Sequence, residues 1–304
     1  MTTQRAQAAA PLARVRWVAP HQMRETGRHP PLGGAAGQTK ALHLIPPRVV
    51  LFDYGHTLVD FQRLPTALIA AYADIRSHLE NLVEHELPEV EDLAHRITGA
   101  MDVIVHQSYS EGRLQELDMI DLLTEAFAGI GVTLGPELAQ ELVIIDHRAF
   151  TDSITVPETT IRALEALQAM GLTMGLVSNI TLLPELMRAD LTSLGLAKFL
   201  AATTFSSEVG WRKPDRRIFT TMLDRLGAAP WESVFVGDRL RDDIGGARAV
   251  GMRSVLTRQF RDELEGPERA EALRIRPEEL DGLLPDRDIQ SLDELPDVLR
   301  AWGA

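Results

Sequence analysis

Between residues 157 and 256, short apolar runs alternate with stretches of helical periodicity, and this alternation limits the fold more than any other feature of the sequence. The expected strands are Thr173–Val177, a short one near 202–205, 233–236 and Arg253–Leu256, and the expected helices are at about 157–170, 183–195, 215–226 and 243–250. Strands that alternate with helices run parallel in one sheet, and the helices cover both of its faces. The pattern therefore predicts an α/β fold in which ligands bind at the carboxyl ends of the strands.

A further strand is expected before this region. The β-branched and aromatic run Arg48–Phe52 stops at Asp53-Tyr54-Gly55. This is the pattern of a buried strand that presents a side chain at its carboxyl end. We therefore expect Asp53 at the ligand-binding edge of the sheet.

Residues 65–150 have a different period. After Pro65, apolar side chains recur at steps of three and four residues, namely Leu68, Tyr72, Ile75, Leu79 and Leu82. This spacing predicts a helix with one buried face. Similar stretches follow at about 88–108, 114–130 and 136–150, and none of them has the pattern of a strand. We expect residues 65–150 to form a compact helical insert between two parts of the core, 47–64 and 151–304.

Two other segments depart from the alternation. Residues 1–46 mix Ala, Gly, Pro and Arg without apolar periodicity, and we expect them to form a disordered tail. Their Arg content resembles a targeting segment, but they lack the apolar core of a signal peptide. Residues 257–285 are charged and interrupted by proline, which indicates a surface excursion before a last helix at Leu292–Trp302.

Charge and composition limit the partners. The tail has six Lys or Arg and one acidic residue, so it carries +5, and because the whole chain carries −13 the remainder carries −18. The part of the chain after residue 46 is therefore strongly acidic, and it repels nucleic acid and anionic membrane surfaces. The chain has no cysteine, and no apolar run reaches the roughly 18 to 20 residues that cross a bilayer. We expect a soluble cytoplasmic protein, and the sequence leaves its oligomeric state open.

Four short segments carry side chains suited to phosphoryl chemistry: Asp53–Leu58, Ser178-Asn179, Lys213-Pro214 and Gly237-Asp238 with Asp242-Asp243. A carboxylate at a strand end can attack phosphorus and form a covalent intermediate. Mg²⁺ bound between Asp53 and Asp238 would offset the repulsion between this carboxylate and the phosphoryl group. Lys213, one of three lysines in the chain, would add a second positive charge.

The carboxyl edge of the expected sheet also has groups that can bind the phosphoryl oxygens and a metal-bound water. Ser178 and the backbone N–H groups at the following helix start can donate hydrogen bonds to an anion. Asp243 opens the helix after Asp238, where the helix dipole favours a carboxylate that can hold a metal-bound water. We expect these groups to converge on a small phosphorylated substrate.

The order and spacing of these segments resemble the haloacid dehalogenase-like (HAD) hydrolase superfamily. The matching stretches are VVLFDYGHTLV at Val49–Val59, LVSN at Leu176–Asn179, GWRKPDRRIF at Gly210–Phe219 and VGDRLRDDIGGARAVGM at Val236–Met252. The resemblance covers about residues 47–256 and the last helix. It implies a Rossmann-like parallel core with a helical cap inserted after the first motif.

The resemblance also implies roles, position by position. Asp53 matches the nucleophile, and Lys213 matches the lysine that neutralises charge. The remaining matches are the phosphate-binding hydroxyl Ser178 beside Asn179 and the Mg²⁺ ligands, namely Asp53, the carbonyl of Gly55, Asp238 and Asp243. These roles describe a hydrolase that uses Mg²⁺ and an aspartyl intermediate, most simply a phosphatase.

One position departs from the family pattern. Phosphatases of this family usually have a second aspartate two residues after the nucleophile, as acid and base, and here that position is Gly55. Loss of a positioned acid or base costs about 10²–10⁴-fold in rate. The substrate could have a leaving group that needs little protonation, such as an acyl or anomeric phosphate. Alternatively, His56 could replace the missing acid.

Three other functions are compatible with parts of the pattern. Dehalogenases of the superfamily lack the second aspartate and use no metal, but Tyr54 lies one position early for their motif, and the acids Asp238, Asp242 and Asp243 favour a cation. Phosphonate-cleaving relatives use a cap lysine, and residues 65–150 contain none. A degenerate member could bind a phosphorylated ligand or a partner protein without turnover.

Several other residues receive structural interpretations. Five histidines of the insert lack the i, i+4 spacing of metal ligands and are expected to pack or to face solvent, namely His78, His85, His95, His106 and His147. In caps of this family type, residues that select the substrate hang over the active site, so the resemblance implies His106, Tyr109 and Arg113, near a helix junction, as candidates. Trp211 is expected to cover its loop or, alternatively, to line the substrate entrance. Asp242 is expected to cap a helix or, alternatively, to bind the metal.

Overall fold

The core is one parallel sheet of six strands in the order β5-β4-β1-β6-β7-β8. The computed structural model describes residues 45–61, 64–83, 85–151, 153–260 and 283–304. The strands are β1 (Val49–Phe52), β4 (Thr173–Ser178), β5 (Ala202–Phe205), β6 (Ser233–Gly237), β7 (Arg253–Thr257) and β8 (Arg287–Ile289). The sequence prediction of an α/β fold with a Rossmann-like parallel sheet is confirmed.

Strand β1 occupies the centre because both of its faces are apolar. All four residues of VVLF are buried, and alternate side chains enter different cores. Val50 and Phe52 pack into one apolar cluster, and Val49 and Leu51 pack into the other. A strand covered on both faces reads as a continuous apolar run, which is why this segment lacks an alternating pattern.

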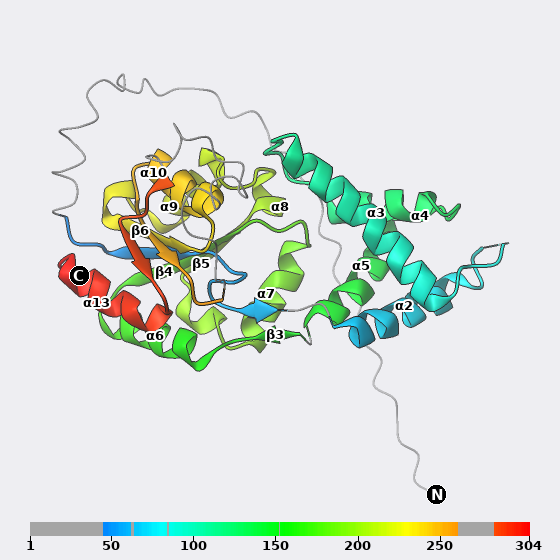
Figure 1. Ribbon diagram of the computed structural model, residues 1–304, viewed down its shortest axis with the longest axis horizontal. Helices are drawn as coiled ribbons and strands as arrows, with labels where there is room; N and C mark the ends of the chain where they lie inside the picture. The colour runs from blue at the N-terminus through cyan, green and yellow to red at the C-terminus, as the bar shows by residue number, and fades with distance from the viewer. Residues whose placement is uncertain (1–44, 62–63, 84, 152, 261–282) are drawn as a thin grey trace, which may run out of the picture.

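Helices cover each face of the sheet (Figure 1). Helices α6 (Glu158–Ala169), α7 (Pro184–Ser193) and α13 (Leu295–Ala301) contribute to the larger cluster, and α9 (Arg216–Leu226) with α10 (Gly246–Ala249) forms the smaller one. The expected helix at 243–250 begins instead with a π-helical stretch, Leu240–Gly245, that leads into α10.

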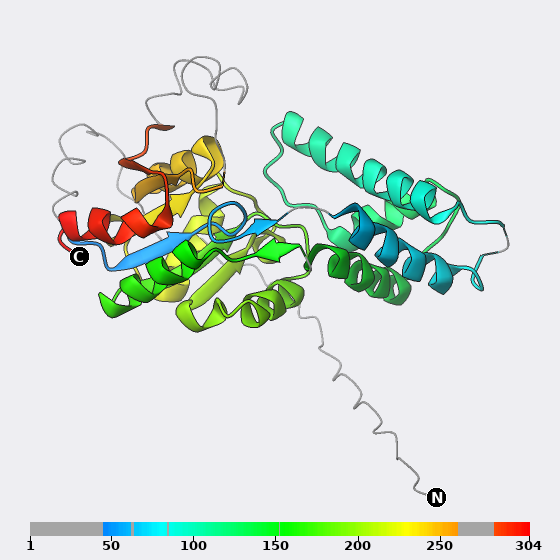
Figure 2. The same ribbon diagram turned by 60° about the horizontal axis from the view of Figure 1, so that its bottom comes forward.

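The predicted helical insert consists of α2 (Pro65–Leu79), α3 (Val90–Ser110), α4 (Met119–Ala128) and α5 (Pro136–Thr151), and it lies to one side of the sheet layers (Figures 1 and 2). Helix α2 packs against both α3 and α5, and α4 packs against α3 and α5. The apolar positions predicted for α2 are buried at Tyr72, Ile75 and Leu79. Leu82 was predicted on this face, but α2 ends at Leu79 and Leu82 is 62% exposed.

A short antiparallel ribbon joins the insert to the core. Strand β2 (Asp60–Phe61) pairs with β3 (Ile154–Thr155). These two strands were not predicted, because two residues are too few for a periodic pattern. The ribbon holds both ends of the insert close to the carboxyl end of β1.

The segment before α4 differs from the prediction of a helix from about 114. Helix α4 begins at Met119, after Asp118 accepts hydrogen bonds from the backbone N–H groups of Ile120 and Asp121. The preceding residues extend toward the core, where Gln115 forms an antiparallel bridge with Trp211. Pairing with a distant segment therefore replaces the first turn of the expected helix.

The C-terminal part also contains more structure than predicted. Strand β8 extends the sheet beyond β7, and the backbone N–H of Arg258 donates to Ile289. Most of the expected tail and of the 257–285 excursion lies outside the described residues. Among the described helices, none is both long and apolar enough to cross a membrane.

Candidate active site

The registers of β1, β4 and β6 bring three carboxylates to one edge of the sheet. Phe52 is level with Leu176 on β4 and with Val236 on β6, so the next residues of β1 and β6 emerge together. Asp53, Asp238 and Asp243 are buried, and their carboxylate oxygens can lie within 4.8 Å of one another. The ends of β1 and β6 and the π-helical stretch that follows β6 therefore bring three carboxylates together.

Lys213 lies between two of these carboxylates. Its Nζ is 2.6 Å from Asp53 Oδ1, 2.7 Å from Asp243 Oδ1 and 3.1 Å from the carbonyl oxygen of Val177. Three partners match the three N–H bonds of an ammonium group. Burial by itself would lower the pKa of Lys213, but Asp243 and Asp53 raise it above its ordinary value, so the side chain keeps its charge.

Asn179 fixes the loop that carries Lys213. The Asn179 side chain donates from Nδ2 to the Lys213 carbonyl at 3.1 Å, and its Oδ1 accepts from the Lys213 backbone N–H at 2.6 Å. Its amide therefore positions the lysine loop in this structure. The role in substrate binding predicted for Asn179 stays a prediction.

Asp243 reaches the site because Gly237, the last residue of β6, has no side chain. A Cβ at Gly237 would lie 2.4 Å from Asp243 Cγ, so only glycine leaves room for this carboxylate. Asp243 Oδ2 also accepts from the backbone N–H of Arg239 at 2.9 Å. Burial raises the pKa of Asp243 to about 6, and the Asp53 carboxylate acts in the same direction, although Lys213 opposes both.

The donor set fits a hard divalent cation. Three carboxylates that converge from separate elements supply the oxygen ligands that Mg²⁺ prefers. Gly55 and Asp53 line one cavity, and the Gly55 carbonyl is a further oxygen donor. Asp242 lies outside this group of three and accepts from Arg239 Nη1 at 3.2 Å, which weakens its interpretation as the alternative ligand.

A cavity of about 120 Å³ opens onto these groups. Its lining comes from the core and from the insert, namely Asp53, Gly55, His56, Phe61, Tyr109, Ser178, Asn179, Lys213, Arg239 and Asp242. Tyr109 on α3 lines it, whereas His106 and Arg113, the other two candidates for substrate selection, are not among its lining residues. The site combines core carboxylates, one buried lysine and one aromatic side chain from the insert.

Phe61 occupies the space beside Gly55. A Cβ at Gly55 would lie 2.6 Å from Phe61 Cε1, so an aspartate there would collide with the ring. The Phe61 ring packs against His56 at 4.6 Å and against Phe150 at 4.7 Å between ring centroids. Phe61 thus fills the space that a side chain at position 55 would occupy, a pairing that the sequence pattern did not reveal.

His56 has a defined orientation beside the nucleophile. Its φ of 57° lies in the left-handed region, which non-glycine residues rarely adopt and which recurs at functional sites. Its Nδ1 is 3.2 Å from Asp60 Oδ1, and its ring lines the cavity with Asp53. This is the arrangement of an imidazole held by a carboxylate.

Arg212, next to Lys213, anchors the insert over the site. It is 1% exposed, donates from Nη2 to Ser108 Oγ at 2.6 Å and to the Arg113 carbonyl at 2.8 Å, and lies 4.1 Å from the centre of the Tyr109 ring. Its Nε is 3.8 Å from Glu116 Oε1. Sequence reasoning missed this residue, because its partners lie about 100 positions away and only the fold brings them together.

Glu116 continues this contact into the core. Its carboxylate accepts from Ser206 Oγ, and that hydroxyl oxygen accepts from the backbone N–H of Ile180 at 2.7 Å. Burial raises the pKa of Glu116, although Ser206, the Leu117 backbone and Arg212 oppose the shift. The insert therefore contacts both the lysine loop and the residues after Ser178.

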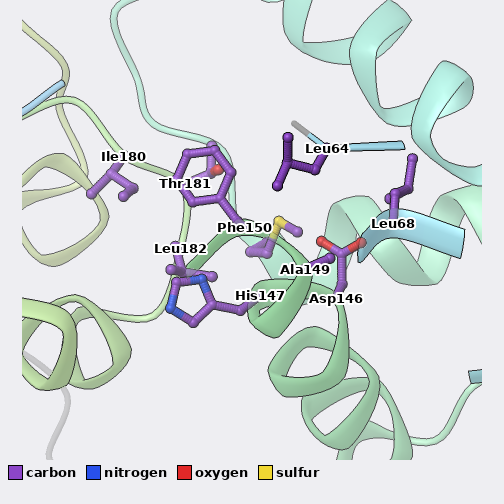
Figure 3. Close-up of a pocket in the computed structure, with 10 residues that line it drawn as sticks. Leu64, Leu68, Asp146, His147, Ala149, Phe150, Ile180, Thr181 and Leu182 are labelled. Atoms are coloured by element: carbon purple, nitrogen blue, oxygen red, sulfur yellow. The ribbon is translucent and has the colours of Figure 1, made fainter. Parts of the chain in front are cut away.

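A second cavity of about 160 Å³ lies between the insert and the core (Figure 3). Its wall is mostly apolar and includes Leu68, Phe150 and Leu182. At one side, His147 Nε2 on α5 is 2.9 Å from Asp190 Oδ2 on α7, and both side chains are buried. This contact agrees with the packing role expected for His147.

The family follows from comparison with known sequences. A model of the haloacid dehalogenase-like hydrolases matches residues 47–251, which is more than half of the chain. The chain belongs to the haloacid dehalogenase-like hydrolases. It is therefore an enzyme of the hydrolase class.

The relatives of this HAD-like hydrolase include named phosphatases. It is 29% identical to a glyceraldehyde 3-phosphate phosphatase of Methanopyrus kandleri, over 83% of this chain and 97% of that protein. It is 37% identical to a phosphoserine phosphatase of Thermus thermophilus, over 46% of this chain and 55% of that protein. The second alignment thus spans about half of each protein.

Solved structures share the fold of this HAD-like hydrolase. A HAD phosphatase of Thermococcus onnurineus matches with a TM-score of 0.53 and 23% identity, over 83% of this chain and 97% of that chain. A 2-haloacid dehalogenase of Pseudomonas syringae matches with a TM-score of 0.56 and 24% identity, over 84% and 99%. Both activities occur on this fold, so the fold alone does not select between them.

We predict that Lys213→Met destabilises this HAD-like hydrolase by about 3–5 kcal/mol, because it leaves two buried carboxylates without their shared cation. Urea unfolding in the presence of a chelator measures the change. Lys198→Met is the matched control, since Lys198 is exposed and its loss should change stability by less than about 0.5 kcal/mol. Equal unfolding midpoints for the wild type and Lys213→Met would contradict the prediction.

We also predict a steric coupling between residues 55 and 61. Gly55→Asp alone should destabilise the protein by about 1–3 kcal/mol, because the new side chain overlaps the Phe61 ring. In Gly55→Asp/Phe61→Ala the same aspartate should cost at least about 1 kcal/mol less. Urea unfolding of the wild type, both single variants and the double variant measures this coupling, and strictly additive effects would refute it.

Proposed function

We propose that this HAD-like hydrolase is a Mg²⁺-dependent phosphatase that acts on small phosphorylated molecules through an aspartyl phosphate on Asp53. The observation that carries the proposal is the contact of Lys213 with Asp53 and Asp243 at 2.6 and 2.7 Å, beside a third carboxylate. This arrangement pairs a strand-end carboxylate with a buried ammonium group and leaves a set of oxygen ligands for a divalent cation. The names of the two phosphatase relatives support the same reaction class.

The first step forms a bond between an Asp53 oxygen and phosphorus, and the phosphorus–oxygen bond to the leaving group breaks. Lys213 holds Asp53 in place and offsets the negative charge that the phosphoryl group brings. Ser178, at the end of β4, lines the cavity and can donate its hydroxyl hydrogen to a phosphoryl oxygen. Asp53, Asp238, Asp243 and the Gly55 carbonyl would hold Mg²⁺, and the cation would neutralise further negative charge on the phosphoryl group.

The second step restores the nucleophile. Water attacks phosphorus, the bond between phosphorus and Asp53 breaks, and inorganic phosphate leaves together with the regenerated carboxylate. Attack by water releases a proton, and departure of an alkoxide in the first step consumes one. The site therefore needs a group that gives a proton first and takes one back afterwards.

His56 is the group that we assign to this proton transfer. Gly55 has no side chain for it, and Phe61 fills the space that an aspartate would use. The His56 ring lines the cavity together with Asp53, and its Nδ1 lies 3.2 Å from Asp60 Oδ1, so the ring is held where it can exchange a proton with the leaving group or with water. Asp60 has the role of a positioning residue.

A metal-independent dehalogenase is the competing reaction. The fold allows it, but a halide ion leaves without needing charge neutralisation by a cation, and three converging carboxylates would repel one another without one. A degenerate protein that binds a ligand or a partner without turnover would not need a carboxylate such as Asp53, which forms an ion pair with the buried Lys213 at the end of a strand. The first experiment below separates these possibilities.

We predict that the wild type with Mg²⁺ and acetyl phosphate forms an acid-stable phosphoenzyme that hydroxylamine cleaves, and that Asp53→Asn forms none. Radiolabelled acetyl phosphate and mass spectrometry of the Asp53 peptide measure it. Asp74→Asn, on the exposed side of α2, is the control and should label like the wild type. Removing Mg²⁺ should abolish labelling.

Two results would reject the proposal. An unlabelled wild type that hydrolyses no phosphomonoester would support a degenerate protein. Release of halide from 2-haloacids without metal would support the dehalogenase.

We predict that His56→Gln affects substrates according to their leaving groups. Alkyl phosphates, whose alkoxides need a proton, should lose about 10²–10⁴-fold in kcat/KM, whereas an acyl phosphate should lose far less. Asp60→Asn should show the same trend with smaller losses. Steady-state kinetics on a graded series of esters measure the dependence, and a uniform loss across the series would remove His56 from the proton transfer.

A further inference from the structure

Arg239 is a second cation on the wall of the catalytic cavity, and the phosphatase mechanism proposed above does not use it. Lys213 has all three donors engaged, at Asp53, Asp243 and the Val177 carbonyl. Within the described part of the chain, the Arg239 guanidinium makes one hydrogen bond, from Nη1 to Asp242. Its side chain is 47% exposed and lines the cavity. A guanidinium has five N–H donors, so most of this fork faces the cavity or solvent.

The backbone around Arg239 is fixed. Its N–H donates to Asp243 Oδ2 at 2.9 Å, which ties it to the turn after β6. Burial by itself would lower the pKa of Arg239, but Asp242, Asp238, Tyr109 and Asp243 together raise it, so it stays charged. Arg239 is therefore a permanently charged side chain on a backbone that is anchored at the site.

Tyr109 brings a hydroxyl to the same cavity. Its ring lies over the buried Arg212 guanidinium at 4.1 Å, and Arg212 in turn holds α3 through Ser108. Burial raises the pKa of Tyr109, with Glu116 adding to the shift, so the phenol keeps its proton as a hydrogen-bond donor. Tyr109 and Arg239 thus present a neutral donor and a charged donor from opposite parts of the fold.

We infer that Arg239 and Tyr109 bind a second anionic group on the substrate, so that the preferred substrates are small phosphomonoesters with a carboxylate or a second phosphate. This inference rests on the proposed phosphatase function. The transferring phosphoryl group already has Lys213, Ser178 and the metal ligands. The guanidinium fork matches an oxyanion with two or more acceptor oxygens, and a neutral hydroxyl or amide gains less from its charge. The cavity of about 120 Å³ that these groups line suits a compact molecule.

The test compares three phosphomonoesters of equal chain length that end in a carboxylate, a phosphate or a neutral amide. For the wild type, kcat/KM should be about 10–100-fold higher for at least one anionic ester than for the amide. The anionic ester with the higher value identifies which oxyanion the site binds. Arg239→Gln should reduce this preference about tenfold or more, and Arg239→Lys should restore part of it, because an ammonium keeps the charge but not the fork.

Arg217→Gln is the matched control. Arg217 is an exposed residue in the first turn of α9, where it stacks on Trp211 and pairs with Asp215, and it is not among the cavity's lining residues. Its loss should leave the ratio between anionic and neutral esters unchanged. If Arg239→Gln lowers kcat/KM equally for all three esters, Arg239 acts on the transferring group or on the fold, and the inference is wrong.

A binding measurement separates this inference from the proposed function. Asp53→Asn is titrated by calorimetry with non-hydrolysable phosphonates that end in a carboxylate, a phosphonate or an amide. Tighter binding of either anionic compound, lost with Arg239→Gln in the same background, supports the second site even if no ester is turned over. Equal binding of all three overturns the inference even if the wild type forms a phosphoenzyme.

Discussion

One buried ammonium group determines how the site can be built. Two carboxylates with oxygens 2.6 and 2.7 Å from the same nitrogen can share a buried place only because Lys213 lies between them. That geometry requires the end of β1, the lysine loop and the turn after β6 to meet within hydrogen-bond distance. The parallel sheet satisfies this requirement in part because β1 and β6 are neighbours, and Asn179, directly after β4, bonds the lysine loop to the same edge. A buried charge cluster of this kind makes the fold and the chemistry depend on the same contacts.

The space beside Asp53 shows how two residues fit together. Gly55 has no side chain, and Phe61 places an aromatic ring where a side chain at that position would lie. The ring in turn packs on His56, whose backbone has left-handed φ and whose Nδ1 lies 3.2 Å from Asp60 Oδ1. This corner of the site is therefore packed with ordered side chains rather than left as a gap.

Local signals were sufficient for five of the six strands described in the sheet, but not for β8. A continuous apolar run that stops at Asp53 indicates a buried strand end from its own residues, and the helix periodicity of α2 is equally local. The sequence pattern could not predict the partners of Arg212, the bridge between Gln115 and Trp211, or the position of Phe61 against Gly55. Each of these depends on two segments that approach only after the insert has packed on the core, or on a ring orientation that periodicity does not encode.

The bridge between Gln115 and Trp211 has a consequence for how such enzymes can diversify. The insert is a continuous segment that leaves and re-enters the core through one ribbon, so exchanging it between relatives would seem simple. In this chain, however, the loop beside Lys213 uses the insert as a strand partner, and Arg212 places its charge inside it. A grafted insert would have to bring its own match for these contacts. If recombination at the ribbon exchanged the insert alone, the loop that carries Lys213 would lose these contacts and Lys213 would no longer be held beside Asp53. The insert and the lysine loop are therefore expected to be inherited as a pair.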